Sequence, residues 1–347
     1  MNGQSAYPAA TIEDVAQAAG VSRAAVSKVI RNAYGVSPAM RERVAAAILE
    51  LDYRPSIAAR AMRGSSFTLG IEIHGFGNQF FTKILAGASE ALTDTRYQLI
   101  IAPAQPDSSE GFRALEALAD RQVDGVVAVS PLVETEWLER LAKRMPLVML
   151  GRHDRSVGYD TVVGDDNKGA RLVMDHLLGL GHKRIAHLTR SPEVTAPELG
   201  TPHGIRLEVY LDSMRSVGLG TDLVRRTGPT EEEAYATARD MLAGKDRPSA
   251  VFAGNDQLAL GVLQAMADLH LTTADVAVVG YDDIAIASHP GISLTTVDQQ
   301  GVEIGRQAIG MLIERIEGRT KPRRFVATPT LRVRDSSRTP PRDSVAD

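Results

Sequence analysis

The sequence predicts a small all-α head followed by a larger α/β body of two lobes, in which parallel sheets are flanked by helices. Three observations predict this fold. The chain of 347 residues is long enough for roughly two or three domains. Its first 66 residues carry a net charge of +3, whereas the remainder carries −7. From Phe67 onward, short apolar runs alternate with amphipathic stretches, a pattern typical of βαβ units.

The composition excludes several classes of protein. With 44% hydrophobic and 24% charged residues, the chain is neither disordered nor collagen-like. The absence of cysteine excludes disulfides, thiolate catalysis and cysteine-ligated zinc. No run of 18 apolar residues predicts a membrane span, and the N-terminus lacks the basic and apolar regions of a secretory signal. We therefore expect a cytoplasmic protein that does not contact the membrane.

The head is expected to contain three short helices. Thr11-Ile-Glu-Asp14 has the form of a capping box, and Gly20 ends the helix that follows it. Ser22 can cap a second helix with an apolar face. Ser37-Pro38 predicts the start of a third helix, since an N-cap residue is followed by proline at the first helical position.

The segment Thr11–Lys28, TIEDVAQAAGVSRAAVSK, has the spacing of a helix-turn-helix motif. Arg23, Ser27 and Lys28 would project from the second helix, where the bases and phosphates of a major groove would lie. Between Arg23 and Arg63 the net charge is +5, which suits a polyanionic partner. The alternative from this pattern alone is an αα-hairpin with a solvated basic face.

The body is expected to alternate strands and helices, with its ligand in a cleft between the lobes. The expected strands are 69–73, 99–102, 126–129, 147–150, 185–188, 250–253 and 276–280, and a late strand within 324–334. The expected helices lie near 80–94, 108–121, 135–144, 167–180, 203–217, 231–243 and 256–269. Residues 338–347 are expected to form a flexible tail.

The chain resembles the lactose repressor family of bacterial transcription regulators. The resemblance rests on TIEDVAQAAGVSRAAVSKVI and VSPAMRERV in the head, and on GHKRI, AGNDQLALG and VGYDD in the body. It extends from Thr11 to about Ser336. It implies a body that is similar to periplasmic sugar-binding proteins. The implied organisation is a head over 9–53, a hinge helix and linker over 54–66, a first lobe over 67–164 and 296–322, and a second lobe over 165–295 and 323–337.

The resemblance further implies a homodimer that places the second head helix in the major groove of a near-palindromic DNA operator. The positions that match base-reading residues are Arg23, Ala24 and Lys28. The other head positions implied to contact DNA are Thr11, Ser22, Ala25, Ser27, Arg31, Ser37 and Tyr53. In the hinge, Ala59, Met62 and Arg63 match the minor-groove segment, where Met62 replaces the usual leucine wedge.

The same resemblance implies a small-molecule effector, with a sugar or sugar derivative expected. The implied effector-binding residues are His74, Phe76, Phe80, Arg152, Arg206, Asn255, Asp282 and Gln299. Arginine, aspartate and amide side chains suit a sugar because they pair with adjacent hydroxyls. Taken singly, Asp282 could instead be a turn residue and Asn255 a helix cap. Position 151 is glycine, where family members often have aspartate.

Two effects of the ligand on DNA binding stay open, and two other functions, transport and catalysis, are disfavoured. The effector could release the protein from DNA, as a free sugar does by family analogy, or it could be a purine or another co-repressor that promotes binding. A sugar-binding transport protein would require an export signal. An enzyme would require a nucleophile or an acid–base pair, and Asp165-Asp166 is interpreted as a turn or interdomain feature. We expect no cofactor and no bound metal.

Overall fold

The computed structural model describes residues 10–30, 33–54, 65–75, 77–104, 110–129 and 132–337. The chain divides into two compact units between Ser66 and Phe67, which we call the head and the body. Within the described ranges, no helix combines the length and the apolar character needed to cross a membrane. The hinge prediction and its residues Ala59, Met62 and Arg63 lie outside the described residues, as do Arg31 and Phe76.

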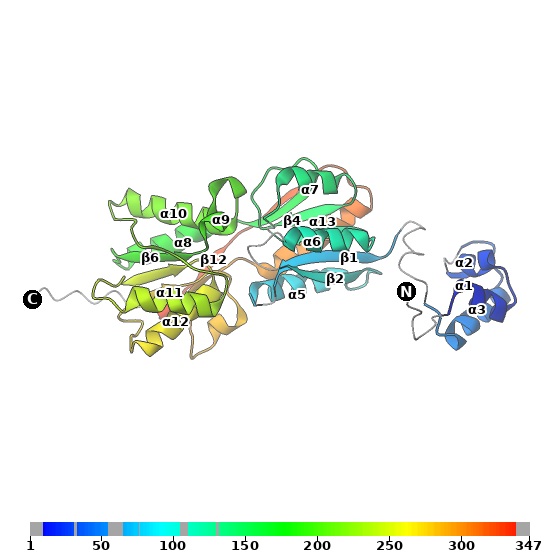
Figure 1. The fold of residues 1–347 in the computed structure, drawn as a ribbon, viewed down its shortest axis with the longest axis horizontal. Coiled ribbons are helices and arrows are strands. Elements are labelled where there is room, and N and C mark those ends of the chain that lie inside the picture. The colour runs from blue at the N-terminus through cyan, green and yellow to red at the C-terminus, as the bar shows by residue number, and fades with distance from the viewer. Residues whose placement is uncertain are drawn as a thin grey trace, which may run out of the picture. The chain divides into compact units, whose positions relative to one another are not determined.

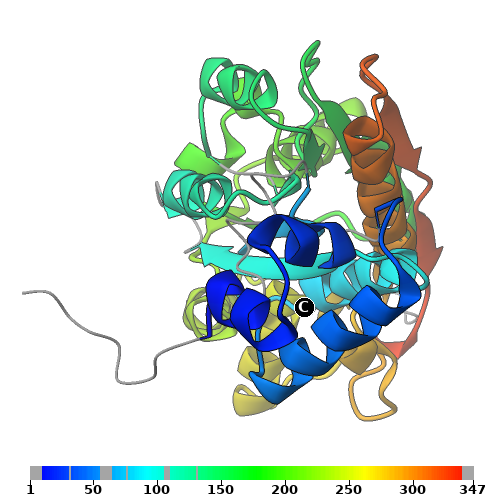
Figure 2. The ribbon, with the colours of Figure 1, turned by 90° about the vertical axis from the view of Figure 1, so that its right-hand side faces the viewer.

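The described residues of the head form three helices, shown in blue in Figure 2. They are α1 (Ile12–Ala19), α2 (Arg23–Ile30) and α3 (Pro38–Glu50). Thr11 and Asp14 form the predicted capping box, and Gly20 ends α1 with a left-handed φ of 63°. Because local signals fix where each helix starts, the helices can pack a small core. That core contains Val15, Ala16, Ala19, Val26, Val44, Ala47 and Tyr53.

The first lobe of the body contains a six-stranded parallel sheet in the order β11-β5-β4-β3-β1-β2. Its strands are β1 (Thr68–His74), β2 (Gln98–Ala104), β3 (Gly125–Val129), β4 (Leu147–Leu150), β5 (Asp160–Gly164) and β11 (Arg324–Ala327). The helices α5 (Phe80–Leu92) and α13 (Gly301–Ile316) pack on one face, and α6 (Glu110–Asp120) and α7 (Thr135–Ala142) on the other. Strands β3, β4 and β5 are buried along their whole length, because helices cover both faces of the sheet.

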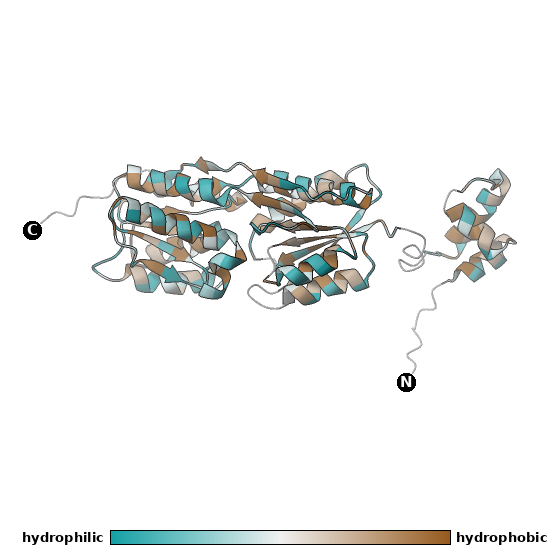
Figure 3. Ribbon diagram, turned by 90° about the horizontal axis from the view of Figure 1, so that it is seen from above, coloured by the Kyte–Doolittle hydropathy of each residue, from teal (hydrophilic) through white to brown (hydrophobic). Residues whose placement is uncertain are grey.

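The second lobe contains a four-stranded parallel sheet in the order β7-β6-β8-β9. Its strands are β6 (Ile185–Thr189), β7 (Val224–Arg226), β8 (Ala250–Ala253) and β9 (Ala277–Val279). Its main helices are α8 (Asp166–Gly179), α10 (Pro202–Ser216), α11 (Glu231–Leu242) and α12 (Asp256–Asp268), and the short helix α9 spans Pro192–Thr195. Residues of α8 and α10 pack on one face of this sheet, and residues of α11 and α12 on the other. Figure 1 shows the two lobes, and Figure 3 shows that the hydrophobic strands lie inside them.

The chain passes between the lobes three times. The first crossing follows β5, the second joins β10 (Thr296–Asp298) to α13, and the third joins β11 to β12 (Thr330–Arg332). Strands β10 and β12 form an antiparallel pair whose residues pack against the core of the second lobe. The expected fold class, a helical head with two parallel-sheet α/β lobes, is confirmed.

Several elements differ from the expectation. The single strand expected within 324–334 is two strands that Thr328 and Pro329 separate, and proline has no N–H with which to continue a ladder. The prediction that residues 323–337 belong to the second lobe is wrong for β11, because Phe325 and Val326 pair with Val162 and Val163 of the first sheet. Strands β5 and β7 and helix α13 were not among the predicted elements.

Helices α5 and α13 cross at a very short distance because both carry glycine at the contact. A methyl group on Gly305 would overlap the Ile84 carbonyl oxygen. We expect Gly305→Ala to destabilise the protein by about 1–3 kcal/mol, since the backbone of α5 would have to move. The measurement is the urea midpoint of unfolding.

Gly310→Ala on the same helix is the matched control. Apart from its chain neighbours and the backbone of its own helix, no atom of the described residues lies within 4 Å of a methyl group at Gly310. The higher helix propensity of alanine should therefore make this variant equal to or more stable than the wild type, by up to ~1 kcal/mol. If Gly305→Ala and Gly310→Ala were equally stable, the close contact between α5 and α13 at Gly305 would be contradicted.

Candidate functional site

Helix α2 presents an exposed basic surface. Ser22 caps the helix by accepting a hydrogen bond from the Ala25 N–H at 3.2 Å, while Val26 points into the head core. Arg23, Ala24 and Lys28 of the same helix are exposed. The guanidinium of Arg23 lies 3.1 Å from the Glu13 carboxylate, and both side chains are about two-thirds exposed. Such a surface ion pair is weak, so Arg23 can turn toward another partner at little cost.

The other head candidates have structural contacts as well. Thr11 is engaged in its capping box, and the hydroxyl of Ser37 accepts the Met40 N–H at 3.3 Å as the cap of α3. The side chain of Tyr53 is only 8% exposed and belongs to the head core. The structure therefore gives these three residues roles that stabilise the head, and their contacts with DNA stay predictions.

The body contains a cavity of about 500 Å³ at the carboxyl ends of both sheets. His74, Val129 and Leu150 line it from the ends of β1, β3 and β4, and residues that follow the second-lobe strands line the opposite side. This is the place where open α/β sheets bind ligands. Residues of both lobes therefore line one shared cavity.

Arg206 lies at the centre of the polar wall of this cavity. Its Nε donates to Asp166 Oδ1 at 2.8 Å, and one terminal nitrogen donates to the Gly254 carbonyl oxygen at 2.7 Å. The other terminal nitrogen lies 3.3 Å from Gln299 Oε1, and the guanidinium carbon lies 3.6 Å above the Tyr281 ring. Burial by itself would raise the pKa of Asp166, but Arg206 and His153 outweigh it and lower that pKa. The pair is therefore fully ionised and rigidly held.

Asp282 is the second polar group of the cavity. Its carboxylate accepts a hydrogen bond from the Gln299 amide, and its backbone N–H donates to the Val297 carbonyl at 2.9 Å. Burial raises the pKa of Asp282 well above its usual range. Its φ of 126° is unusual for a residue other than glycine, and such backbone strain is typical of ligand sites.

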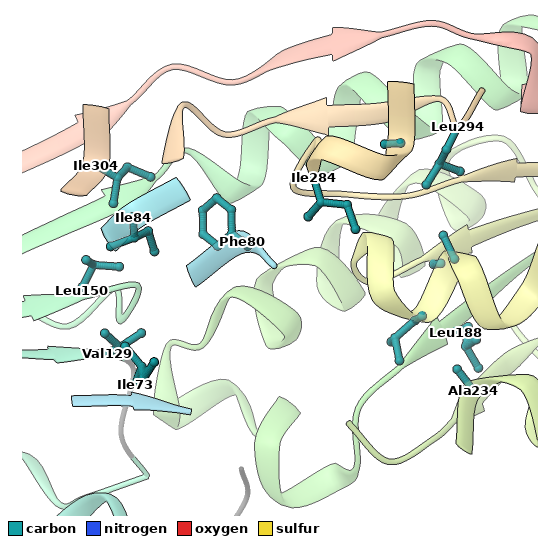
Figure 4. Packing of buried hydrophobic residues seen from close by; sticks show 14 of the residues in the cluster. Ile73, Phe80, Ile84, Val129, Leu150, Leu188, Ala234, Ile284, Leu294 and Ile304 are labelled. Carbon is teal, nitrogen blue, oxygen red and sulfur yellow. The ribbon is translucent and has the colours of Figure 1, made fainter. Parts of the chain in front are cut away.

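The two walls of the cavity differ in character. On the second-lobe side, Asn255 uses its side-chain oxygen to cap α12 through the Leu258 N–H at 2.9 Å, which leaves its amide nitrogen as a donor. On the first-lobe side, the described lining is largely apolar, and Figure 4 shows Phe80, Ile84 and Leu150 together there. A ligand with polar edges and an apolar face fits between such walls.

Comparison with known proteins identifies the family. Residues 11–56 match the bacterial regulatory proteins of the lacI family, and residues 174–337 match the periplasmic binding protein-like domain. The ribose operon repressor of Escherichia coli strain K12 is 35% identical over 335 residues, covering 94% of this chain and 100% of that protein. The chain belongs to the lacI family of bacterial regulatory proteins. It is therefore a transcriptional regulator and not an enzyme.

Other members of the lacI family show the same coverage. The transcriptional repressor PurR of Photobacterium profundum is 30% identical over 337 residues, covering 94% of this chain and 98% of that protein. Among solved structures, a complex of the regulator CelR with cellobiose has a TM-score of 0.69 at 31% identity, covering 94% of this chain and 100% of that chain. A lac repressor dimer bound to operator has a TM-score of 0.79 at 25% identity, covering 95% and 99%.

The cavity of this lacI-family protein brings together most of the residues expected to bind an effector. They are His74, Phe80, Arg206, Asn255, Asp282 and Gln299. Arg152 does not line the cavity, and its role in effector binding stays a prediction. Its terminal nitrogens donate at 2.6 Å to the Val133 carbonyl and to the Thr135 hydroxyl, and only its neighbour Gly151 lines the cavity.

Sequence reasoning missed several polar residues of the lining, among them Asp166, Arg190 and His203. Asp165-Asp166 is interpreted from the sequence as a turn or interdomain feature: Asp165 caps α8 through the Lys168 N–H at 3.0 Å. Asp166 lies between the lobes, where it contacts His153 of the first lobe and Arg206 of the second, and it also lines the cavity. If strand β5 had been predicted, Asp165 and Asp166 would have been expected at the carboxyl end of that strand. No group of three His, Asp or Glu side chains within the described ranges is placed to hold a metal ion.

Strand β1 ends in a buried pair of titratable residues beside the cavity. Glu72 is fully buried, and its carboxyl group accepts the Val129 N–H at 2.9 Å. Burial raises the pKa of Glu72 to about 8. Burial, assisted by Arg190, lowers the pKa of His74 to about 4. Both groups are therefore largely uncharged near neutral pH.

We expect Glu72 to make the protein less stable as the pH rises. Because its pKa is about 8 in the folded protein and near 4.5 when exposed, the folded state keeps a proton that the unfolded state loses between these values. Stability is full below pH 4.5 and falls as the pH rises toward 8. Glu72→Gln stays neutral and keeps an oxygen for Val129, so at pH 8 it should be more stable than the wild type by on the order of 4 kcal/mol.

The measurement compares urea unfolding of both proteins at pH 5 and pH 8. The control is Glu116→Gln, which changes an exposed carboxylate of α6 and should behave like the wild type. A stability difference between Glu72→Gln and the wild type that is the same at both pH values would show that Glu72 does not titrate as stated.

Proposed function

We propose that this protein is a ligand-responsive transcriptional repressor, which binds a near-palindromic operator as a homodimer and a small sugar or sugar derivative in the cavity of its body. The observation that carries the proposal is the surface of α2. There, Arg23, Ala24 and Lys28 are exposed on a capped helix whose other side is fixed in the head core.

The side chains of α2 suit the reading of base edges. An arginine can donate two hydrogen bonds to guanine, and the methyl group of Ala24 can contact a thymine methyl. Lys28 supplies charge for a phosphate or a base. A dimer reads the two halves of a palindrome with two copies of this helix. The hinge residues, including Met62, would then insert into the minor groove between them.

The polar wall supports a sugar as effector. Arg206, Asn255 and Asp282 offer a fork of donors, an amide and a carboxyl group to adjacent hydroxyls, and Phe80 offers an apolar face. The ribose operon repressor and the cellobiose complex of CelR, which are 35% and 31% identical to this chain, support the same class. The similarity to PurR keeps a purine co-repressor as the second candidate, and the sign of the ligand's effect on DNA affinity separates the two.

Ligand binding can reach the DNA through the junction of the lobes. The backbone N–H of His153 donates to the Gly200 carbonyl of the second lobe at 2.9 Å, and its ring lies 2.8 Å from the Asp166 carboxylate. Arg324 of β11 lies 3.3 Å from the same ring. A change in the angle between the lobes therefore alters contacts around the cavity. Strand β1 of the first lobe follows the linker in the sequence, so the first lobe is the one that the linker joins to the head. Ligand and operator must then affect each other's affinity reciprocally.

We expect Arg23→Ala to relax discrimination at one symmetric base pair of the operator. The loss should be roughly 1–3 kcal/mol, because a bidentate contact with guanine disappears. An operator selected from random duplexes, and its single-base variants, would be titrated with both proteins at fixed salt concentration.

Arg43→Ala is the control, since Arg43 is an exposed arginine of α3 and should leave the ranking of the base variants unchanged. If Arg23→Ala discriminates between the base variants as the wild type does, α2 does not read that base pair.

We expect Arg206→Ala and Asp282→Ala to weaken effector binding roughly ten- to a hundredfold, because each removes a charge-assisted or buried hydrogen bond of about 1.5–3 kcal/mol. The measurement is a calorimetric titration of the full chain with a ligand that alters operator binding. Arg215→Ala on the same helix α10 is the control, because Arg215 is largely exposed and far along the helix from the cavity. Wild-type affinity in both cavity variants would place the effector elsewhere.

A further inference from the structure

We propose that the first lobe makes a second, sequence-independent contact with the DNA that the head binds. The surface is the edge of the first sheet at which its strands begin, and we call it the linker edge because β1 follows the linker there. It consists of the four turns that lead from a helix into a strand: 93–97, 121–124, 143–146 and 317–323. Its partner is the phosphate backbone of a DNA duplex. This inference rests on the proposed binding of an operator by the head.

The linker edge is a continuous row of turns. All six strands of the first sheet are parallel, so they all begin at this edge. The chain enters the sheet at Phe67, whose N–H donates to Asp124 at 2.8 Å and whose ring lies 4.1 Å from the guanidinium carbon of Arg96. From β2 to β11 the row spans five strand spacings, or about 24 Å. A duplex of that length presents roughly fourteen phosphate charges.

The linker edge is basic although the body is acidic. Its four turns contain seven basic and three acidic residues, which gives a net charge of +4. The whole body carries −7, so the rest of the body carries −11. The basic residues are Arg96, Arg121, Lys143, Arg144, Arg319, Lys321 and Arg323, and the acidic ones are Asp94, Asp124 and Glu317.

Most of these cations are available to a partner. Arg319 and Arg323 are ion-paired with Glu314 at 2.8 Å, and Arg319 also contacts the buried Asp160. Four others are exposed and have no ion pair among the described residues: Arg121, Lys143, Arg144 and Lys321. Exposed cations that keep their full charge can neutralise phosphates and release the counterions of the DNA.

The position of these residues after helices does not by itself explain the charge. Cations complement the dipole at the carboxyl end of a helix, so the second sheet offers a comparison. Because the carboxyl ends of both sheets line the cavity, the second sheet begins at the other end of the body (Figure 1). Its helix-to-strand turns, 180–184, 217–223, 243–249 and 269–276, carry a net charge of only +1. The excess of positive charge is therefore specific to the lobe that the linker joins to the head.

The linker keeps this edge near any DNA that the head binds. Eleven peptide steps join Arg54 of the head to Ser65, and they span at most about 40 Å. A contact within such a tether is intramolecular and has a high effective concentration. Phosphate contacts that would be too weak alone can therefore add to the affinity that α2 provides.

The test measures operator affinity of the full chain between about 50 and 200 mM salt, with the operator selected from random duplexes. We expect the combined variant Lys143→Gln, Arg144→Gln and Lys321→Gln to lose at least about tenfold in affinity at the lowest salt concentration. The slope of log affinity against log salt should become shallower by at least about 2, because each phosphate contact contributes about 0.9. The loss should be equal for the operator and its single-base variants, since phosphate contacts carry no sequence information.

The matched control is the combined variant Lys183→Gln, Lys245→Gln and Arg247→Gln, which removes three exposed cations from the turns of the second sheet. It should bind as the wild type does, and urea unfolding should show that both variants fold with wild-type stability. A wild-type slope in the linker-edge variant, or an equal loss in both variants, would overturn the inference. Operator binding by the head would survive that result. It would fail, and the inference with it, if the wild type bound the selected operator no better than a scrambled duplex.

Discussion

The architecture of the cleft depends on one buried charge, the guanidinium of Arg206. A cation with only 3% of its surface exposed is costly unless it is paired and fully hydrogen-bonded. The second lobe meets this requirement with the Asp166 carboxylate, the Gly254 carbonyl and the face of the Tyr281 ring. These partners come from α8, from the end of β8 and from the segment after β9. Pairing one charge therefore aligns three separate parts of the lobe.

Helix α8 contributes more than a carboxylate to this arrangement. Asp166 lies in its first turn, where the helix dipole also stabilises a negative charge. One turn later, Gly169 leaves space for the Tyr281 hydroxyl, which any side chain at that position would overlap. Gln299 joins Arg206 to Asp282 from the segment that crosses into α13. A ligand that replaces these internal hydrogen bonds consequently acts on a connection between the lobes.

The sequence predicts the parts of the structure that local chemistry determines. Thr11, Gly20 and Ser37 fix the ends of the head helices through contacts within four residues, and the apolar runs of β3, β4 and β8 mark strands that helices cover on both faces. Strand β5 was not predicted, because its apolar run is short and lies between Asp160 and Asp165. The extra polar lining could not be found locally, since His203 and Asp166 reach the cavity only after α10 and α8 pack together. Arg152 lies outside the lining, whereas its neighbour Gly151, with a φ of 87°, lines the cavity.

Strand β11 has a consequence for synthesis of the protein on the ribosome. The first sheet begins with β1 at Thr68 but is completed only by Arg324–Ala327, which pair along β5. The four strands of the second sheet have all been translated by Val279. The lobe that comes first in the sequence is thus finished last. Until some 160 residues after β5 have been translated, one edge of β5 has no strand to pair with, and exposed strand edges promote aggregation. The first lobe is therefore exposed to aggregation for longer during synthesis than the second lobe.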